Sequence, residues 1–204
     1  MPKRNSNRAY KRGEAHRDAR LFLIVTEGER EDRYFSWFDR KNQRIRVQLV
    51  PRQGQASAPK HFLHRLDQFL DDSGADVQME DSVWFVLDVD AWSRESIDEL
   101  VAACNQTPNW HIAISNPCFE VWLNMHKGPL PDNDEDCAAL KTMLGSRLHP
   151  GGFHPNVICP LIEDAIKYAK EADTHPNQSY PDRMQTKVYL LASSVLAVLG
   201  QNWR

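Results

Sequence analysis

The chain has 204 residues, of which 41% are hydrophobic and 26% charged, and its net charge is −3. These values are typical of one globular body with a real core. No apolar run approaches the ~18 to 20 residues of a membrane span, and the N-terminus has no apolar signal core, so we expect a soluble cytoplasmic protein. The cysteines form no CxxC pair, which argues against a zinc knuckle or a disulfide framework; we expect free thiols at Cys104, Cys118, Cys137 and Cys159.

The first 20 residues form a separate electrostatic region. They carry seven basic and two acidic side chains, a net charge of +5, which leaves −8 for the remainder. A basic, apolar-poor segment before an acidic body is expected to be a mobile arm, and such arms bind nucleic-acid phosphate. A solubilising tail without a partner is the alternative. The candidate phosphate contacts of this arm are Lys3, Arg4, Arg8, Lys11 and Arg12.

After this arm, strands and helices alternate. Short apolar runs rich in β-branched and aromatic residues predict strands at 21–26, 45–50, 83–87 and 111–115. Helices are expected at 31–41, at 93–104, and after residue 57, where Ser57 is a suitable cap and Pro59 falls in the first turn. Four strands separated by three helices predict a parallel sheet with right-handed crossovers and helices on both faces.

The last part of the chain is expected to be helical. Candidate helices cover 117–126, 134–148, 159–172 and 185–200, joined by loops rich in Pro, Gly and Asn. We therefore divide the chain into a basic arm (1–20), an α/β core (21–115) and a helical extension packed on it (116–204). The last helix is apolar around much of its circumference, which leaves open a core position or an interface, including one between copies of the chain; its apolar residues are Leu190, Leu191, Val195, Leu196, Val198 and Leu199.

Two of the expected strands run directly into acidic residues. The first leads into Glu27, Gly28 and Glu31, and the third leads into Asp88 and Asp90. The carboxyl ends of parallel strands share one edge of a sheet, so these acids are expected to meet there. Clustered carboxylates repel one another unless a cation compensates them, and Mg²⁺ prefers such oxygen ligands. Solvated acids at strand ends are the alternative.

Together these segments resemble a known fold and family. A strand ending in a Glu-Gly pair, two further βα steps and a strand ending in Asp-x-Asp are similar to the Toprim fold, which topoisomerases, bacterial primases and overcoming-lysogenization-defect nucleases share. More specifically, TEGEREDRYF, VLDVD and NPCFEVWLNMH resemble the RloB-like family, over residues 21 to about 126 and onward through THPNQSYPDRMQTKVYLL. The order and spacing of the motifs carry the resemblance, because a Glu-Gly pair or an Asp-x-Asp alone is weak.

The resemblance implies a Toprim-like α/β core and a Mg²⁺-dependent nuclease, with Mn²⁺ as a substitute. It implies that Glu27 is a metal ligand or general acid/base and that Asp88 and Asp90 are metal ligands. A bound divalent ion would stabilise charge on the phosphodiester and activate water. It also implies an ATPase partner protein and a place in an abortive anti-phage system. The alternative is a partner-dependent binding or regulatory subunit without catalysis of its own.

Other acids near the strand ends compete for roles in this site. Glu31 lies one helical turn after Glu27, so the two carboxylates could share a metal, although the adjacent Asp32 competes with it. Glu29 is expected to point into solvent. Gly28 suits a close approach to a ligand or an ordinary turn equally well.

The segment after the fourth strand offers one further acid. Glu120 lies on the first turn of the expected helix, either as a further metal ligand of the site or as an acid that favours a helix N-terminus. His126 is expected to be packed or on the surface rather than a ligand.

Some basic and aromatic residues are candidates for contacts with phosphate and bases. The resemblance to related nucleases also implies a basic residue near the metals, which Lys187 or Arg183 could supply, although a surface position is favoured for the lysine. Arg52 and Lys60 flank a glycine-containing loop and could contact backbone phosphate. Three aromatic side chains could stack on bases, although packing is favoured for each: Tyr34, Trp92 and Tyr180.

Overall fold

The computed structural model describes residues 19–52, 59–74, 77–90, 92–131, 133–148, 150, 152–201 and 203. Some of the expectations above fall outside these residues. They are the phosphate contacts at Lys3, Arg4, Arg8, Lys11 and Arg12, the cap at Ser57 and the side chain of Lys60.

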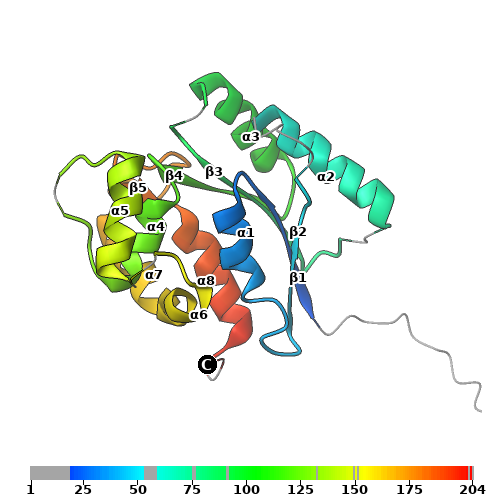
Figure 1. Cartoon of the computed structure of the whole chain (residues 1–204). Coiled ribbons are helices and arrows are strands. Elements are labelled where there is room, and N and C mark those ends of the chain that lie inside the picture. The colour runs from blue at the N-terminus through cyan, green and yellow to red at the C-terminus, as the bar shows by residue number, and fades with distance from the viewer. Residues whose placement is uncertain are drawn as a thin grey trace, which may run out of the picture.

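A five-stranded sheet in the order β2-β1-β3-β4-β5 forms the centre of the molecule (Figure 1). Four strands are parallel, which confirms the expected α/β class: β1 (Arg20–Thr26), β2 (Ile45–Leu49), β3 (Ser82–Asp88) and β4 (Trp110–Asn116). Thr26 pairs with Val86 and Asp88 pairs with Ser115, so the carboxyl ends of β1, β3 and β4 meet at one edge. The acidic segments of the sequence begin at this edge.

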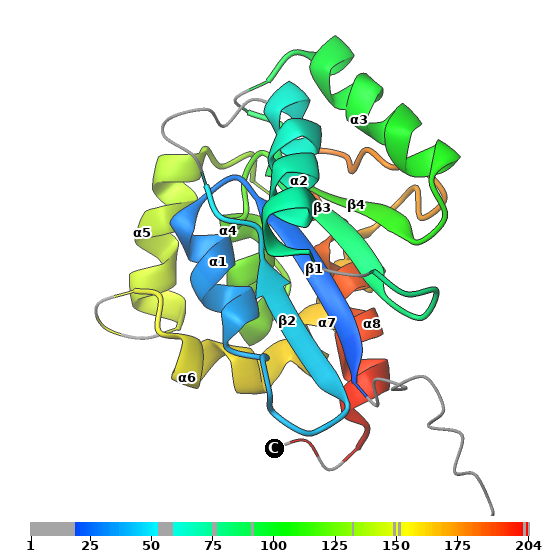
Figure 2. The same ribbon diagram turned by 90° about the vertical axis from the view of Figure 1, so that its right-hand side faces the viewer.

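Helices cover both faces of the sheet (Figures 1 and 2). One face packs on α2 (Pro59–Ser73) and α3 (Arg94–Gln106), and the other on a larger layer that includes α1 (Glu29–Ser36) and α4 (Glu120–Asn124). The alternation along β1 explains the two cores, because Leu21, Leu23 and Val25 face the first layer while Phe22 and Ile24 face the second. The remaining helices are α5 (Cys137–Arg147), α6 (Pro155–Ile158), α7 (Ile162–Ala172) and α8 (Val188–Leu199), with 3₁₀ turns at Met125–Lys127 and Cys159–Leu161.

Some boundaries differ from those expected, for identifiable reasons. The expected helix 185–200 begins only at Val188, because Gln185 and Thr186 form β5 and pair antiparallel with the end of β4. The helix expected at 31–41 spans Glu29–Ser36, with turns after it. The segment 155–172 is divided into α6, a 3₁₀ turn and α7, and Pro160, which has no N–H to donate, lies in that turn.

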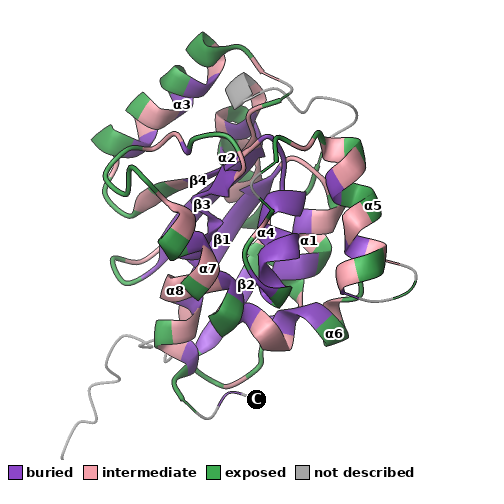
Figure 3. Cartoon of the chain, turned by 90° about the vertical axis from the view of Figure 1, so that its left-hand side faces the viewer, coloured by how far each residue is buried: buried purple, intermediate pink, exposed green. Residues whose placement is uncertain are grey.

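The last helix lies in the core of the molecule. Leu191, Val195 and Leu199 are buried in the larger cluster, whereas Leu190 keeps 39% of its surface exposed. Buried surface is concentrated on the strands and on the inner faces of the helices, while the outer faces of α3 and α5 are exposed (Figure 3). Among the described residues, no helix combines the length and apolar character needed to cross a bilayer.

Candidate functional site

A cavity of about 480 Å³ opens at the carboxyl ends of β1 and β3, beside the N-terminal turns of α1 and α4. We call it the acidic pocket. It brings together five acids singled out from the sequence: Glu27, Glu31, Asp88, Asp90 and Glu120. Glu29 also lines it and is exposed, as expected, while Arg30 and Lys141 contribute the positive charges.

Glu27 is held in place by two donors. Its Oε2 accepts a hydrogen bond from the Trp92 indole N–H at 2.9 Å and one from the Asp88 backbone N–H at 3.2 Å. Burial raises the pKa of Glu27, and these two hydrogen bonds oppose the rise. The carboxylate is therefore oriented toward β3 before any ligand enters.

Asp88 and Glu31 are the two carboxyl groups of the pocket whose ionisation burial opposes most. Burial raises the pKa of Glu31 to about 7, and the charges of Glu27 and Asp32 add to the rise. Burial also raises the pKa of Asp88 well above its ordinary value, together with the charges of Glu31 and Glu27. Asp88 Oδ1 is buried and has no hydrogen-bond partner among the described residues. A buried acceptor of this kind calls for a donor or a cation.

The donor set suits a hard divalent cation. Mg²⁺ usually takes one or two carboxylates and completes its shell with water and phosphate oxygens. Within the described ranges, no three or more His, Cys, Asp or Glu side chains are already grouped to hold a metal ion. Glu27, Glu31 and Asp88 nevertheless fit such an ion, because they are mutually repelling carboxylates around one cavity and one of their oxygens lacks a partner.

Asp90 lies at the exposed rim of the same pocket. Its Oδ2 accepts a hydrogen bond from the Cys137 thiol at 3.0 Å, and its backbone N–H donates to the Pro117 carbonyl at 3.3 Å. Cys118 lines the pocket beside this contact, and both cysteines are free thiols, as expected. Asp90 therefore belongs to the pocket but stands in a more solvated position than Asp88.

Glu120 is buried, with 5% of its side chain exposed, and forms an ion pair with Arg30. It is also the first residue of α4, where a negative charge is favoured. Its position is therefore compatible with both roles considered from the sequence, in the site or at the helix N-terminus. The sequence reasoning missed Arg30, although its position three residues after Glu27 at the start of α1 was a usable signal.

Asp32 points away from the acidic pocket. It accepts a hydrogen bond from the Thr26 hydroxyl and forms an ion pair with Arg52 at 3.2 Å. Of the two adjacent acids, the structure therefore places Glu31 in the pocket and Asp32 outside it. Arg52, expected to contact phosphate, is partly exposed and is paired with this acid.

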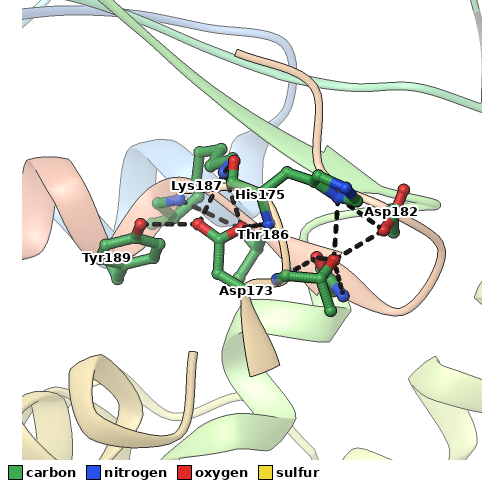
Figure 4. Close-up of polar contacts among 9 residues, drawn as sticks. Asp173, His175, Asp182, Thr186, Lys187 and Tyr189 are labelled. Carbon is green, nitrogen blue, oxygen red and sulfur yellow. Dashed lines mark hydrogen bonds and ion pairs between the residues drawn. The ribbon is translucent and has the colours of Figure 1, made fainter. Parts of the chain in front are cut away.

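Lys187 is neither on the surface, as favoured from the sequence, nor in the acidic pocket. Its side chain is 1% exposed, and its ammonium donates to both oxygens of Asp173, at 2.8 and 2.6 Å, and to the His175 carbonyl at 2.7 Å (Figure 4). The burial follows from β5, because the Lys187 backbone N–H extends the pairing with β4 through Ile114 and turns the residue inward. Arg183 is 46% exposed and pairs with Asp134.

His126 is packed, as expected. Its Nε2 lies 2.9 Å from the Tyr34 hydroxyl, and its Nδ1 faces the Trp122 and Leu123 carbonyls. Burial lowers the pKa of His126 to about 3, so the ring is neutral at physiological pH. Tyr34 is fully buried beside it, which removes this tyrosine from the candidates for base stacking.

Comparison with curated proteins and with solved structures finds no match. A family model described as RloB-like protein matches residues 22–195. The matched segment runs from β1 into α8 and includes every acid of the pocket. The chain therefore belongs to the RloB-like family.

Proposed function

We propose that this RloB-like protein is a Mg²⁺-dependent nuclease that hydrolyses nucleic-acid phosphodiester bonds at the acidic pocket. The observation that carries the proposal is the buried, partnerless Oδ1 of Asp88 among carboxylates whose pKa values are raised. Such an arrangement opposes stability unless it serves a ligand, which is why perturbed acids in a cleft favour a functional site. The α/β fold and the RloB-like match support the same class of chemistry.

The carboxylates of the acidic pocket would be the metal ligands of the proposed nuclease. Asp88, Glu31 and Glu27 would hold Mg²⁺, or Mn²⁺ in its place, with Asp90 at the rim. When bound, the ion would supply charge compensation for the phosphodiester oxygens and lower the pKa of a coordinated water.

The remaining groups position the reactants. The Trp92 indole and the Asp88 backbone N–H fix Glu27, so its other oxygen is free either to bind the ion or to accept a proton from the attacking water. Lys141 and Arg30 lie in the same cavity and would attract the substrate phosphate. No nucleophilic side chain is needed, because water is the attacking group.

The biological setting is also part of the proposal. The family resemblance supports an effector subunit of an abortive anti-phage system that acts with an ATPase partner. A second candidate is a partner-dependent nucleic-acid-binding or regulatory subunit without autonomous catalysis. It is favoured by the Arg30–Glu120 ion pair, because a protein cation already neutralises part of the acidic cluster.

The test is a cleavage panel with Mg²⁺ or Mn²⁺ on plasmid, single-stranded DNA, total RNA and transfer RNA. We expect cleavage by the full chain and its loss in Asp88→Asn and Glu27→Gln, whereas Asp71→Asn, an exposed acid on α2, retains it. Isothermal calorimetry with each metal provides the second measurement. Cleavage that persists in both pocket variants would refute the site, and a chain that neither cleaves nor binds a divalent ion would support the second candidate.

A further inference from the structure

A second cavity, of about 380 Å³, lies near the acidic pocket and has different chemistry. Its walls come from the connection between β3 and α3, the first turn of α3, the end of β4, and the loop between α7 and β5. The side chains that matter here are Trp92, Arg94, Asn116, Tyr180 and Arg183. We call it the aromatic pocket. Its volume falls in the range of ~300 to 1,000 Å³ that is typical of ligand sites.

The end of β3 separates the two pockets, and Trp92 links the wall of one to Glu27 of the other. Asp88 and Asp90 line the acidic pocket while Val89, between them, lines the aromatic one. Trp92 lines the aromatic pocket and donates its indole N–H to Glu27 of the acidic pocket at 2.9 Å. A ligand that extends from one cavity to the other would therefore contact the same tryptophan that orients Glu27.

The aromatic pocket combines rings with cations. The guanidinium carbon of Arg94 lies 3.4 Å from the centre of the Tyr180 ring. Arg94 is 67% exposed, with Asp98 at 3.4 Å, and Arg183 also keeps much of its surface in solvent. Unpaired bases stack on aromatic rings and on guanidinium planes, while arginine binds phosphate. Phe119, the aromatic residue that lines the acidic pocket, is only 1% exposed and gives a base little area for stacking.

The loop that forms one wall is held firmly at both ends. Near its start and end, the buried Asp173 and Lys187 pair with each other, and the Tyr189 hydroxyl donates to Asp173 at 2.7 Å (Figure 4). Asp182 accepts a hydrogen bond from the Thr174 hydroxyl at 2.6 Å.

Two further hydrogen bonds fasten the middle of the loop to the sheet side of the pocket. Asn116 Nδ2 donates to the Pro181 carbonyl at 3.1 Å, and the Tyr180 hydroxyl donates to the Arg94 carbonyl at 3.2 Å. The wall is thus built in advance, which lowers the ordering cost of binding.

We infer that the aromatic pocket binds an unpaired nucleotide of the nucleic-acid strand whose phosphodiester enters the acidic pocket. The inference rests on the proposed function and narrows its substrate class to single-stranded nucleic acid. The base packs against Trp92 and the stacked Arg94–Tyr180 pair, and its phosphate meets Arg183. A base inside a duplex is stacked and paired, so it does not reach these rings.

Binding can be measured apart from cleavage. We would use the full chain with Asp88→Asn, which lowers the negative charge of the acidic pocket, in EDTA and about 0.15 M salt, because phosphate contacts depend on salt. A short fluorescein-labelled single strand, and the same strand annealed to its complement, are compared by anisotropy. Tyr180→Leu and Arg183→Gln alter the aromatic pocket. Arg44→Gln is the matched control, since this exposed arginine precedes β2 at the opposite end of the sheet.

The expected result is tighter binding of the single strand than of the duplex, and a loss of about tenfold in single-strand affinity in each pocket variant. The control should keep its affinity, and thermal melting should show that all variants are folded. Equal affinity for both substrates, no binding of either, or unchanged affinity in both pocket variants would overturn the inference. If cleavage depends on Asp88 but the aromatic-pocket variants bind the single strand as well as the parent chain does, the nuclease proposal holds and the inference fails. If the single strand binds as expected but the full chain cleaves nothing, the aromatic pocket binds a nucleotide and the nuclease proposal fails.

Discussion

Replacing Glu31 by Gln should stabilise the metal-free protein at neutral and alkaline pH. Burial is the main cause of the raised pKa of Glu31, which is about 7 in the folded chain against an ordinary 4.5. An acid whose folded pKa is raised favours the folded state fully below its unfolded pKa, and this contribution is lost as pH rises through the folded value. The relevant window therefore runs from about pH 4.5 to pH 7.

The size of the effect follows from that shift. At 1.36 kcal/mol for each pKa unit, ionising Glu31 in the folded chain costs about 3 kcal/mol by pH 8. The amide cannot ionise, so Glu31→Gln should exceed the wild type by up to about 3 kcal/mol in free energy of unfolding at pH 8. The difference should shrink toward zero near pH 4.

Urea unfolding at several pH values in EDTA measures the difference in free energy of unfolding directly. A second set of titrations, with Mg²⁺ in place of EDTA, tests the metal site. If the ion bound with a Kd of ~1 mM, ~10 mM Mg²⁺ would stabilise the wild type by about 1.4 kcal/mol. The gain should be smaller in Glu31→Gln, which lacks one ligand charge. Glu99→Gln, an exposed acid on α3, is the control and should change neither the pH slope nor the response to Mg²⁺. An unchanged pH slope in Glu31→Gln would refute the argument.

Two further substitutions test the surroundings of the pocket. A Cβ at Gly28 would lie 2.6 Å from Glu31 Oε2, the end of a flexible side chain, so Gly28→Ala should displace that carboxylate and slow cleavage by about 10- to 100-fold while the fold persists. A Cβ at Gly145 would meet no atom within 4 Å beyond its chain neighbours and its own helix backbone, so Gly145→Ala should keep full activity in the same assay. Lys187→Met would leave Asp173 buried without its cation and should lower the free energy of unfolding by about 3 to 5 kcal/mol in urea titrations, whereas Lys127→Met, on the surface, should not.

The sequence predicted β1 and β3 well because these two strands are buried on both faces. Runs such as LFLIVT and SVWFVL have no polar alternation, which is typical of strands in a parallel sheet whose two faces are covered by helices. The meeting of Glu27 and Asp88 followed from the same rule, since parallel strands direct their carboxyl ends to one edge.

What the sequence could not predict depended on contacts between distant residues. A strand of two residues, Gln185 and Thr186, has no periodicity of its own and exists only because the edge of β4 is open to pairing. Lys187 follows this strand inward, and Asp173, which neutralises it, lies 14 residues earlier with no motif to connect them. Trp92 is a similar case, because its indole reaches Glu27 across 65 residues of sequence.

The Asp-x-Asp motif joins the last residue of β3, Asp88, to the turn after the strand, where Asp90 lies. Side chains alternate between the two faces of an extended chain, and the Val89 backbone N–H still donates to the Ser115 carbonyl at 3.0 Å, so the pairing with β4 continues past Asp88. Asp88 and Asp90 therefore face the acidic pocket while Val89 faces the aromatic one. The motif thus places its two carboxylates in the acidic pocket and its apolar middle residue in the wall of the aromatic pocket.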